Sequence, residues 1–329
     1  MPPATTHDAA WKARQREKAI GYLIRFAAVT VWGLLPLVVR YSPSAKIPNV
    51  FAQGGLYFIG GLLFSSGMVA IRAALDPALL RQLRLPWSHW LPVLLASEIS
   101  IIAFTYISLN LTSGTHFILL NNFSPVFALL VAIVFWRQQI PYLRHRHTQW
   151  VMLAIFLLGS LGSSLLFADA ARGNSAGTVE GDLWALGAIV TDVALIIAQI
   201  RYSRLVPPVQ IPLVNFYMFL LALPLFFLLF GLNPVRLLAL PADQLGWGIA
   251  IGMLGALGYH LNYEAFRRID GFLAFLMFNL SILITFGVEA FVLKAIPPSF
   301  ILVVGGGLIV GASIWAENIN ARCEREVQI

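Results

Sequence analysis

Four ionisable side chains lie within long apolar stretches of this sequence, namely Arg25, Glu98, Asp192 and His260. In a helix surrounded by lipid, each such residue costs at least about 2.5–3.5 kcal/mol, so each needs a partner or a function. A buried carboxylate can bind an ammonium group or carry a proton, and an imidazole exchanges protons near neutral pH. Glu98, Asp192 and His260 are therefore the candidates for proton coupling.

Each candidate also has a purely structural explanation. Glu98 lies at a depth in its apolar stretch similar to that of Arg25, so the two could form a buried ion pair. His260 could simply hydrogen-bond to a backbone carbonyl. No basic residue lies at the depth of Asp192, which makes it the residue that helix packing explains least. Both explanations stay open for Glu98, because an ion pair that breaks during transport would also act as a gate.

Two further patterns predict structure and no chemistry. Glu264 precedes Arg267 and Arg268 by three and four residues, a spacing that forms ion pairs on a helix surface. Small residues spaced four apart let helix backbones approach closely inside a membrane. Such pairs are Gly159/Ser163, Gly248/Gly252 and Gly307/Gly311.

The elements that carry these residues are long apolar helices. The 329 residues are 59% hydrophobic and 11% charged, with a mean hydropathy of +0.79. A soluble domain contains about 25% charged residues, so the composition indicates a protein that lies in lipid. Each run holds roughly the 20 residues that a membrane-spanning helix needs, and none shows the short alternation of a barrel strand. The predicted spans are 20–40, 50–71, 90–110, 113–136, 149–168, 182–202, 211–231, 245–265, 271–293 and 298–317.

The basic residues predict the orientation of these spans. If the amino terminus is cytoplasmic, every cytoplasmic segment carries at least two Lys or Arg, as the positive-inside rule expects. We therefore expect a multi-pass protein of the cell inner membrane with both termini in the cytoplasm. The net charge of +7 is explained by these loops, so no nucleic-acid partner is predicted. The single cysteine, Cys323, excludes an intrachain disulfide, and no metal site or cofactor is predicted.

The two halves of the chain resemble one another. With one constant difference in residue number, the segment 106–136 aligns with the segment 263–293 without a gap. The same difference aligns Tyr106 with Tyr263, Gly114 with Gly271, Asn122 with Asn279 and Ser124 with Ser281. Five spans per half would make the second half inverted relative to the first, an arrangement typical of transporters. The predicted fold is an all-α integral membrane protein of two inverted five-helix repeats. Its segments are a tail 1–19, a repeat 20–168, a linker 169–181, a repeat 182–317 and a tail 318–329.

A central cavity between the repeats would contain several of these side chains. Asn122 and Asn279 lie near the middle of equivalent spans, where they could contact a solute or join helices by hydrogen bonds. Trp32 and Tyr106 could form apolar walls, although aromatic side chains in such helices also pack as core. The predicted substrate-binding residues are Trp32, Glu98, Tyr106, Asn122, Asp192 and Asn279.

The sequence resembles the drug/metabolite transporter superfamily, and in particular its EamA-type ten-helix members. The likeness is carried by three stretches, which are Ala27 to Gly33 ending in Trp-Gly, Tyr106 to Trp136 with Thr112-Ser113 and Ser124-Pro125-Val126-Phe127, and Gly271 to Ala312. The chain departs from the family at Arg137-Gln138, where a Gly-Glu pair is usual, and at Ile282, where a proline would lie. The resemblance implies metabolite efflux by alternating access.

These observations together predict a secondary transporter and no enzyme. It would move a small organic solute, most simply outward, and an amino acid is one candidate. A proton gradient or facilitated exchange could drive the transport. The alternative is a membrane-embedded enzyme that modifies lipids, for which His89, His145, His147 and Glu264 lie near the cytoplasmic ends. A channel would usually show a filter motif, and the sequence contains none.

Overall fold

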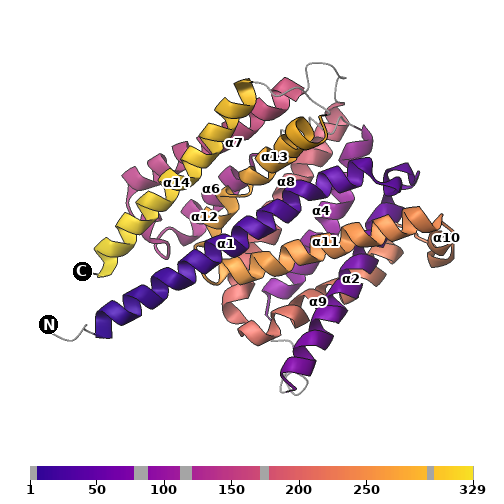
Figure 1. Ribbon diagram of the computed structural model, residues 1–329, viewed down its shortest axis with the longest axis horizontal. Helices are drawn as coiled ribbons and strands as arrows, with labels where there is room; N and C mark the ends of the chain where they lie inside the picture. Colours follow the sequence, from indigo (N-terminus) through magenta and orange to yellow (C-terminus); the bar gives the residue numbers. More distant parts are fainter. Residues whose placement is uncertain (1–5, 78–87, 112–120, 171–177, 295–299, 329) are drawn as a thin grey trace.

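The computed structural model describes residues 6–77, 88–111, 121–170, 178–294 and 300–328. In these ranges the chain forms helices and the turns that join them, and no strand. The long helices lie side by side in one bundle, and the amino and carboxyl ends are near each other at the left of Figure 1. The long helices are α1 (Thr6–Tyr41), α2 (Val50–Leu75), α4 (Trp90–Leu111), α6 (Ser124–Trp136), α7 (Arg146–Ala170), α8 (Val179–Leu205), α9 (Ile211–Leu229), α11 (Ala242–Phe266) and α14 (Phe300–Gln328).

Short elements join and interrupt these helices. Three are turns of 3-10 helix that each begin with proline, and one is a π-helical turn. They are η1 (Pro43–Lys46), η2 (Pro141–Leu143), η3 (Pro208–Gln210), α10 (Pro234–Leu238), α12 (Gly271–Leu276), α13 (Asn279–Gly287) and the π turn η4 (Val288–Val292).

The described helices identify a multi-pass membrane protein. Seven of them are long and apolar enough to cross a bilayer. They lie within Lys12–Val39, Val50–Leu75, Trp90–Ser108, Arg146–Leu166, Val179–Leu205, Pro208–Leu229 and Gly271–Val292. Large apolar side chains such as Leu228 (78% exposed), Phe300 (79%) and Val190 (69%) point out of the bundle, which suits lipid and not water.

Two predicted spans are interrupted, which corrects the expectation of continuous helices over 113–136 and 271–293. The chain turns at Asn122–Phe123 before α6, and again at Met277–Phe278 between α12 and α13. Pro125 explains the first turn, because it lacks an N–H and cannot continue a helix from the residues before it. At the second turn the N–H of Phe278 bonds to the carbonyl of Phe275, one residue short of an α-helical bond. Gly114 and the start of the first of these spans lie outside the described residues.

Glycines bring α2 and α11 into backbone contact. A Cβ added to Gly252 would lie 2.1 Å from the carbonyl oxygen of Tyr57, and one added to Gly60 would lie 2.0 Å from that of Ile249. The packing role predicted for Gly248 and Gly252 is therefore confirmed. The role predicted for Gly307 and Gly311 is wrong, because no described atom lies within 4 Å of a Cβ at either position.

We expect Gly252→Ala to destabilise the protein in detergent by more than the roughly 1–3 kcal/mol of ordinary overpacking, because its methyl group meets backbone that cannot rotate away. The measurement is the thermal unfolding midpoint of the purified protein. Gly246→Ala is the matched control, since it adds the same methyl group to the same helix in open space. Equal midpoints for the two variants would contradict the close packing of α2 and α11.

Candidate functional site

Glu98 lies in α4 and is completely buried among tyrosines. The hydroxyl of Tyr57 in α2 is 3.4 Å from its Oε1, and Tyr259 in α11 also hydrogen-bonds to the carboxylate. Tyr263, one turn further along α11, lies within electrostatic range, and its hydroxyl has no partner among the described residues. The second oxygen of Glu98, Oε2, is likewise without a described partner. The result is a carboxylate in an aromatic cage with one oxygen unused, and we call these four residues the tyrosine cage.

Trp32 extends the aromatic wall of the tyrosine cage. It approaches the ring of Tyr259 edge-on with 5.0 Å between the ring centroids. Two glycines of α11 make room for this wall. A Cβ on Gly255 would lie 2.5 Å from the ring of Tyr57, and one on Gly258 would lie 2.8 Å from the indole of Trp32. Trp32 thus packs on Tyr259, one of the tyrosines around Glu98.

Tyr106 lies further away along α4. Its ring is 3.1 Å from the position that a Cβ of Gly54 would take, and it interacts electrostatically with Tyr57. Tyr106 and Glu98 are separated by eight positions of one helix, which corresponds to a rise of about 12 Å. Tyr106 therefore faces α2 well along the helix from the carboxylate.

Asp192, in the middle of α8, is half-buried, and its Oδ2 is buried without a described partner. The hydroxyl of Ser124, the first residue of α6, hydrogen-bonds to it. The same hydroxyl is 3.2 Å from Oδ1 of Asn121. A hydroxyl has one proton, so Ser124 can donate to Asp192 or to Asn121 but not to both. The protonation of Asp192 is thereby coupled to the hydrogen bonds at the turn before α6.

Arg25 of α1 supplies the basic neighbour that the sequence did not reveal for Asp192. The two side chains interact electrostatically, and the guanidinium is completely buried. Its Nη1 donates to Oδ1 of Asn262, and its plane lies over the ring of Phe266 at 5.5 Å. Arg25 forms no ion pair with Glu98 among the described contacts, so the alternative of an Arg25–Glu98 pair is wrong.

The same guanidinium stabilises the interruption between α12 and α13. Its Nε donates to the carbonyl oxygen of Ala274 at 2.6 Å. That carbonyl is free because the N–H of Phe278, its usual helical partner, bonds to Phe275 instead. An unsatisfied carbonyl inside a membrane costs several kcal/mol, so Arg25 compensates directly for the broken helix.

Asn122 and Asn279, which the sequence alignment of the two halves pairs, lie in different surroundings. Asn122 lies at the turn before α6, next to Asn121, and its Nδ2 has no described partner. Asn279 begins α13 and faces α7, where its Nδ2 is 3.3 Å from a Cβ built on Gly159. Neither amide atom of Asn279 has a partner among the described residues. Asn121, the residue before Asn122, is the asparagine that contacts Ser124.

His260 is separate from both carboxylates. It interacts electrostatically with Glu264 and Arg72, toward the end of the bundle where α11 ends. Glu264 itself forms an ion pair with Arg268 at 2.5 Å, which confirms the predicted spacing. His260 therefore belongs to the ends of the helices and not to the region of Glu98 and Asp192.

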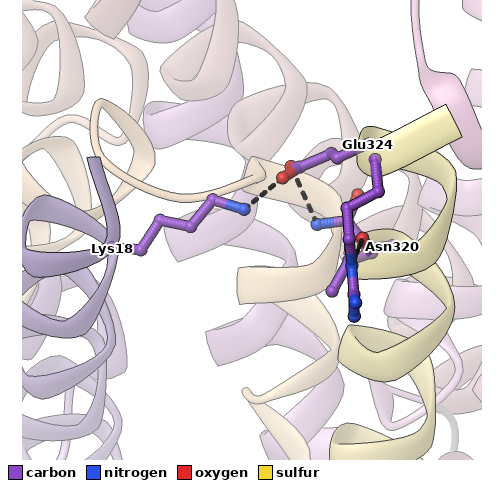
Figure 2. A network of polar contacts seen from close by, with 5 residues as sticks. Lys18, Asn320 and Glu324 are labelled. Atoms are coloured by element: carbon purple, nitrogen blue, oxygen red, sulfur yellow. Dashed lines mark hydrogen bonds and ion pairs between the residues drawn. The ribbon is translucent and has the colours of Figure 1, made fainter. Parts of the chain in front are cut away.

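Ion pairs join α1, α11 and α14 at the end of the bundle where both termini lie. Lys18 of α1 pairs with Glu324 of α14, which also accepts a hydrogen bond of 3.2 Å from Asn320 (Figure 2). Arg268, just after α11, lies 3.3 Å from Glu17 of α1. These contacts connect α1 to α14 and to the end of α11, and we call the two ion pairs the terminal ion pairs.

The loop between α6 and α7 is anchored at the same end. The hydroxyl of Tyr142 donates to Oδ1 of Asp270 at 2.8 Å, and the same oxygen caps α12 by accepting from the N–H groups of Phe272 and Leu273. Burial, with the nearby Asp270 carboxylate, holds the pKa of Tyr142 well above its ordinary value. The phenol therefore stays a donor at any physiological pH. In the described part of the chain, no three His, Cys, Asp or Glu side chains come together as a metal site.

Comparison with known proteins identifies the fold and nothing finer. No protein-family profile matches the chain, and no curated protein matches it in sequence. Among solved structures, 29 chains match. One, described only as "Crystal structure of protein", is 21% identical, with a TM-score of 0.68, and the match covers 93% of this chain and 99% of that one. A solved structure therefore shares this helical arrangement over nearly its whole length.

Proposed function

We propose that this protein is a secondary transporter of a small organic solute, which it carries by alternating access. The observation that carries the proposal is a pair of carboxylates inside the bundle, Glu98 and Asp192, each with one buried oxygen that has no described partner. The charge of Asp192 acts on Glu98, so the two carboxylates belong to one polar region inside a bundle that faces lipid. Such groups are retained in membrane helices chiefly where they bind solutes or ions.

The packing of the helices supports ten spans in two inverted repeats. If spans one to five are α1, α2, α4, α6 and α7, their mates are α8, α9, α11, α12 with α13, and α14. If each span is replaced by its mate, the contact between α4 and α8 becomes the contact between α11 and α1, and both are present. The contact between α6 and α8 likewise becomes the contact between α13 and α1, which is also present. The contacts between α2 and α9 and between α7 and α14 each join a helix to its own mate, so the exchange leaves them unchanged. The two interrupted helices, before α6 and between α12 and α13, are mates as well, and interrupted helices commonly form transporter sites.

The tyrosine cage suits a solute with a protonated amine. A carboxylate attracts the ammonium group, and aromatic faces attract it further by cation–π interaction. An amino acid or a related amine has this chemistry, and the fully buried site would exclude it until one end of the bundle opens. We propose export as the direction, with a proton on Glu98 or Asp192 as the exchanged ion.

The terminal ion pairs would lie on the cytoplasmic side. Basic residues concentrate in the loops at that end, and under the positive-inside rule this supports the proposal that both termini are cytoplasmic and that the protein lies in the cell inner membrane. The structure would then be closed to the cytoplasm. Breaking the terminal ion pairs would open it.

Uptake of labelled amino acids and small amines into proteoliposomes, with and without an imposed pH gradient, tests the proposed function. We expect saturable uptake of one solute class that the gradient accelerates. Absence of saturable uptake across the panel, from protein that is folded and monodisperse, would contradict the proposal and favour an assay for lipid modification.

Removing either carboxylate should impair this transport. We expect Glu98→Gln to weaken the apparent affinity for the amine about 10- to 100-fold, because a charge-assisted hydrogen bond contributes about 1.5–3 kcal/mol. Asp192→Asn should abolish the acceleration by the pH gradient, because the amide cannot carry the proton. Glu180→Gln, an exposed carboxylate at the start of α8, is the control and should transport like the parent. Parental kinetics in both the Glu98 and the Asp192 variant would refute these roles.

Reversing one charge of the terminal ion pairs should change the transport rate modestly. Lys18→Glu places two carboxylates together, and we expect about a two- to fivefold change in uptake, since partly exposed pairs contribute up to about 1 kcal/mol. The double variant Lys18→Glu/Glu324→Lys restores opposite charges and should recover the parental rate. A single variant that transports normally, or a double variant that is no better than the single one, would exclude a gating role for this contact.

A further inference from the structure

A strongly basic cleft lies between the end of α6 and the beginning of α7. It has a volume of about 740 Å³ and is lined by Arg137, Gln138, Arg144, Arg146 and Gln149. Three guanidinium groups and two amides thus converge without any carboxylate in the lining. We call this feature the arginine cleft.

A second cleft at the same end shows how unusual this lining is. It contains Arg14, Lys18, Arg267 and Arg268, and also Glu17 and Glu324, with which two of these basic residues form the terminal ion pairs. Two of the four basic side chains of that cleft therefore have a partner of opposite charge, and its lining contains two carboxylates. The arginine cleft has none in its lining, so its charge is available to an external anion.

Local hydrogen bonds orient the lining for this purpose. The Nε of Arg144 donates to the carbonyl of Gln138 at 3.2 Å, and Nε2 of Gln149 donates to the carbonyl of Leu143 at 2.6 Å. These bonds fix the two ends of the loop while other guanidinium N–H groups stay free to donate. Helix α7 begins at Arg146, so the positive end of its macrodipole adds to the same potential. Arginines in this arrangement match the paired oxygens of a phosphate group.

Apolar side chains beside the cleft identify the source of the phosphate. Val134 and Phe135, in the last turn of α6, are each 69% exposed, and Trp150 in α7 is 62% exposed. All three lie within a few residues of the cleft and point out of the bundle. An exposed tryptophan at the end of a membrane helix is typical of the interface between lipid headgroups and chains. A soluble phosphate would make no use of these side chains.

We propose that the arginine cleft binds the phosphate headgroup of an anionic phospholipid, with the acyl chains lying along Val134, Phe135 and Trp150. The basic end of the bundle would place this site at the leaflet that is rich in anionic lipid. This site is distinct from the tyrosine cage and does not depend on the proposed transport.

Lipid binding to the detergent-purified protein tests the proposal directly. Native mass spectrometry gives the affinity for dioleoyl phosphatidylglycerol and, as a neutral reference, dioleoyl phosphatidylcholine. We expect the triple variant Arg137→Gln/Arg144→Gln/Arg146→Gln to bind phosphatidylglycerol at least about 10-fold more weakly, with no change for phosphatidylcholine. The control Lys12→Gln/Arg14→Gln/Arg16→Gln removes the same charge from the end of α1 and should bind phosphatidylglycerol like the parent.

Two results would overturn the lipid site. One is equal loss of phosphatidylglycerol binding in both triple variants, which would show an effect of net charge alone. The other is competition by inorganic phosphate or glycerol 3-phosphate at the concentration of the lipid, which would show that the cleft takes a soluble anion. All the substituted side chains are exposed, and size-exclusion chromatography of each variant establishes that it is folded.

Discussion

The buried guanidinium of Arg25 is the contact on which the interior of this bundle depends. It donates to the carbonyl of Ala274 that the interrupted helix leaves free, joins α11 through Asn262, and acts on Asp192 in α8. A buried cation needs compensation for its hydrogen bonds and for its charge, and in Arg25 the Nε and Nη1 groups have acceptors while Nη2 has no described partner. One residue of the first predicted repeat thus stabilises the irregular backbone of the second. Arg25 also connects the interruption between α12 and α13 to Asp192, the carboxylate beside the turn before α6.

The hydroxyl of Ser124 has two possible acceptors in the polar interior. Ser124 has one proton to share between Asp192 and Asn121, so a proton or an ammonium group at Asp192 would change the hydrogen bonds where α6 begins. Glu98 lies in the same polar region and is held by phenol groups alone. Ligand binding can shift such an equilibrium only through different contacts in each state, and these carboxylates can make them.

The sequence predicted what depends on local pattern and missed what depends on tertiary contact. Apolar runs located the helices, and the spacing of Glu264 and Arg268 predicted their ion pair. No proline lies near the interruption at Met277–Phe278, so the sequence did not predict it. Pro125 could have predicted the turn at Asn122–Phe123. The tyrosine cage unites three helices, and only the glycines at 255 and 258 gave a signal for it. Similarly, the predicted Arg25–Glu98 ion pair rested on the similar depth of the two residues. Depth along a helix does not show which neighbouring helix a side chain faces, so the prediction missed Asp192.

The measurement that tests the account most directly is the accessibility of the polar interior from the two sides of the membrane. A single cysteine, introduced by Ser124→Cys after Cys323→Ser, would sit beside Asp192 in a position that is now fully buried. Alternating access predicts labelling by a membrane-impermeant thiol reagent from either side, and protection by the transported solute. Labelling from one side only, or from neither, would show that this region is a static core and would contradict the account.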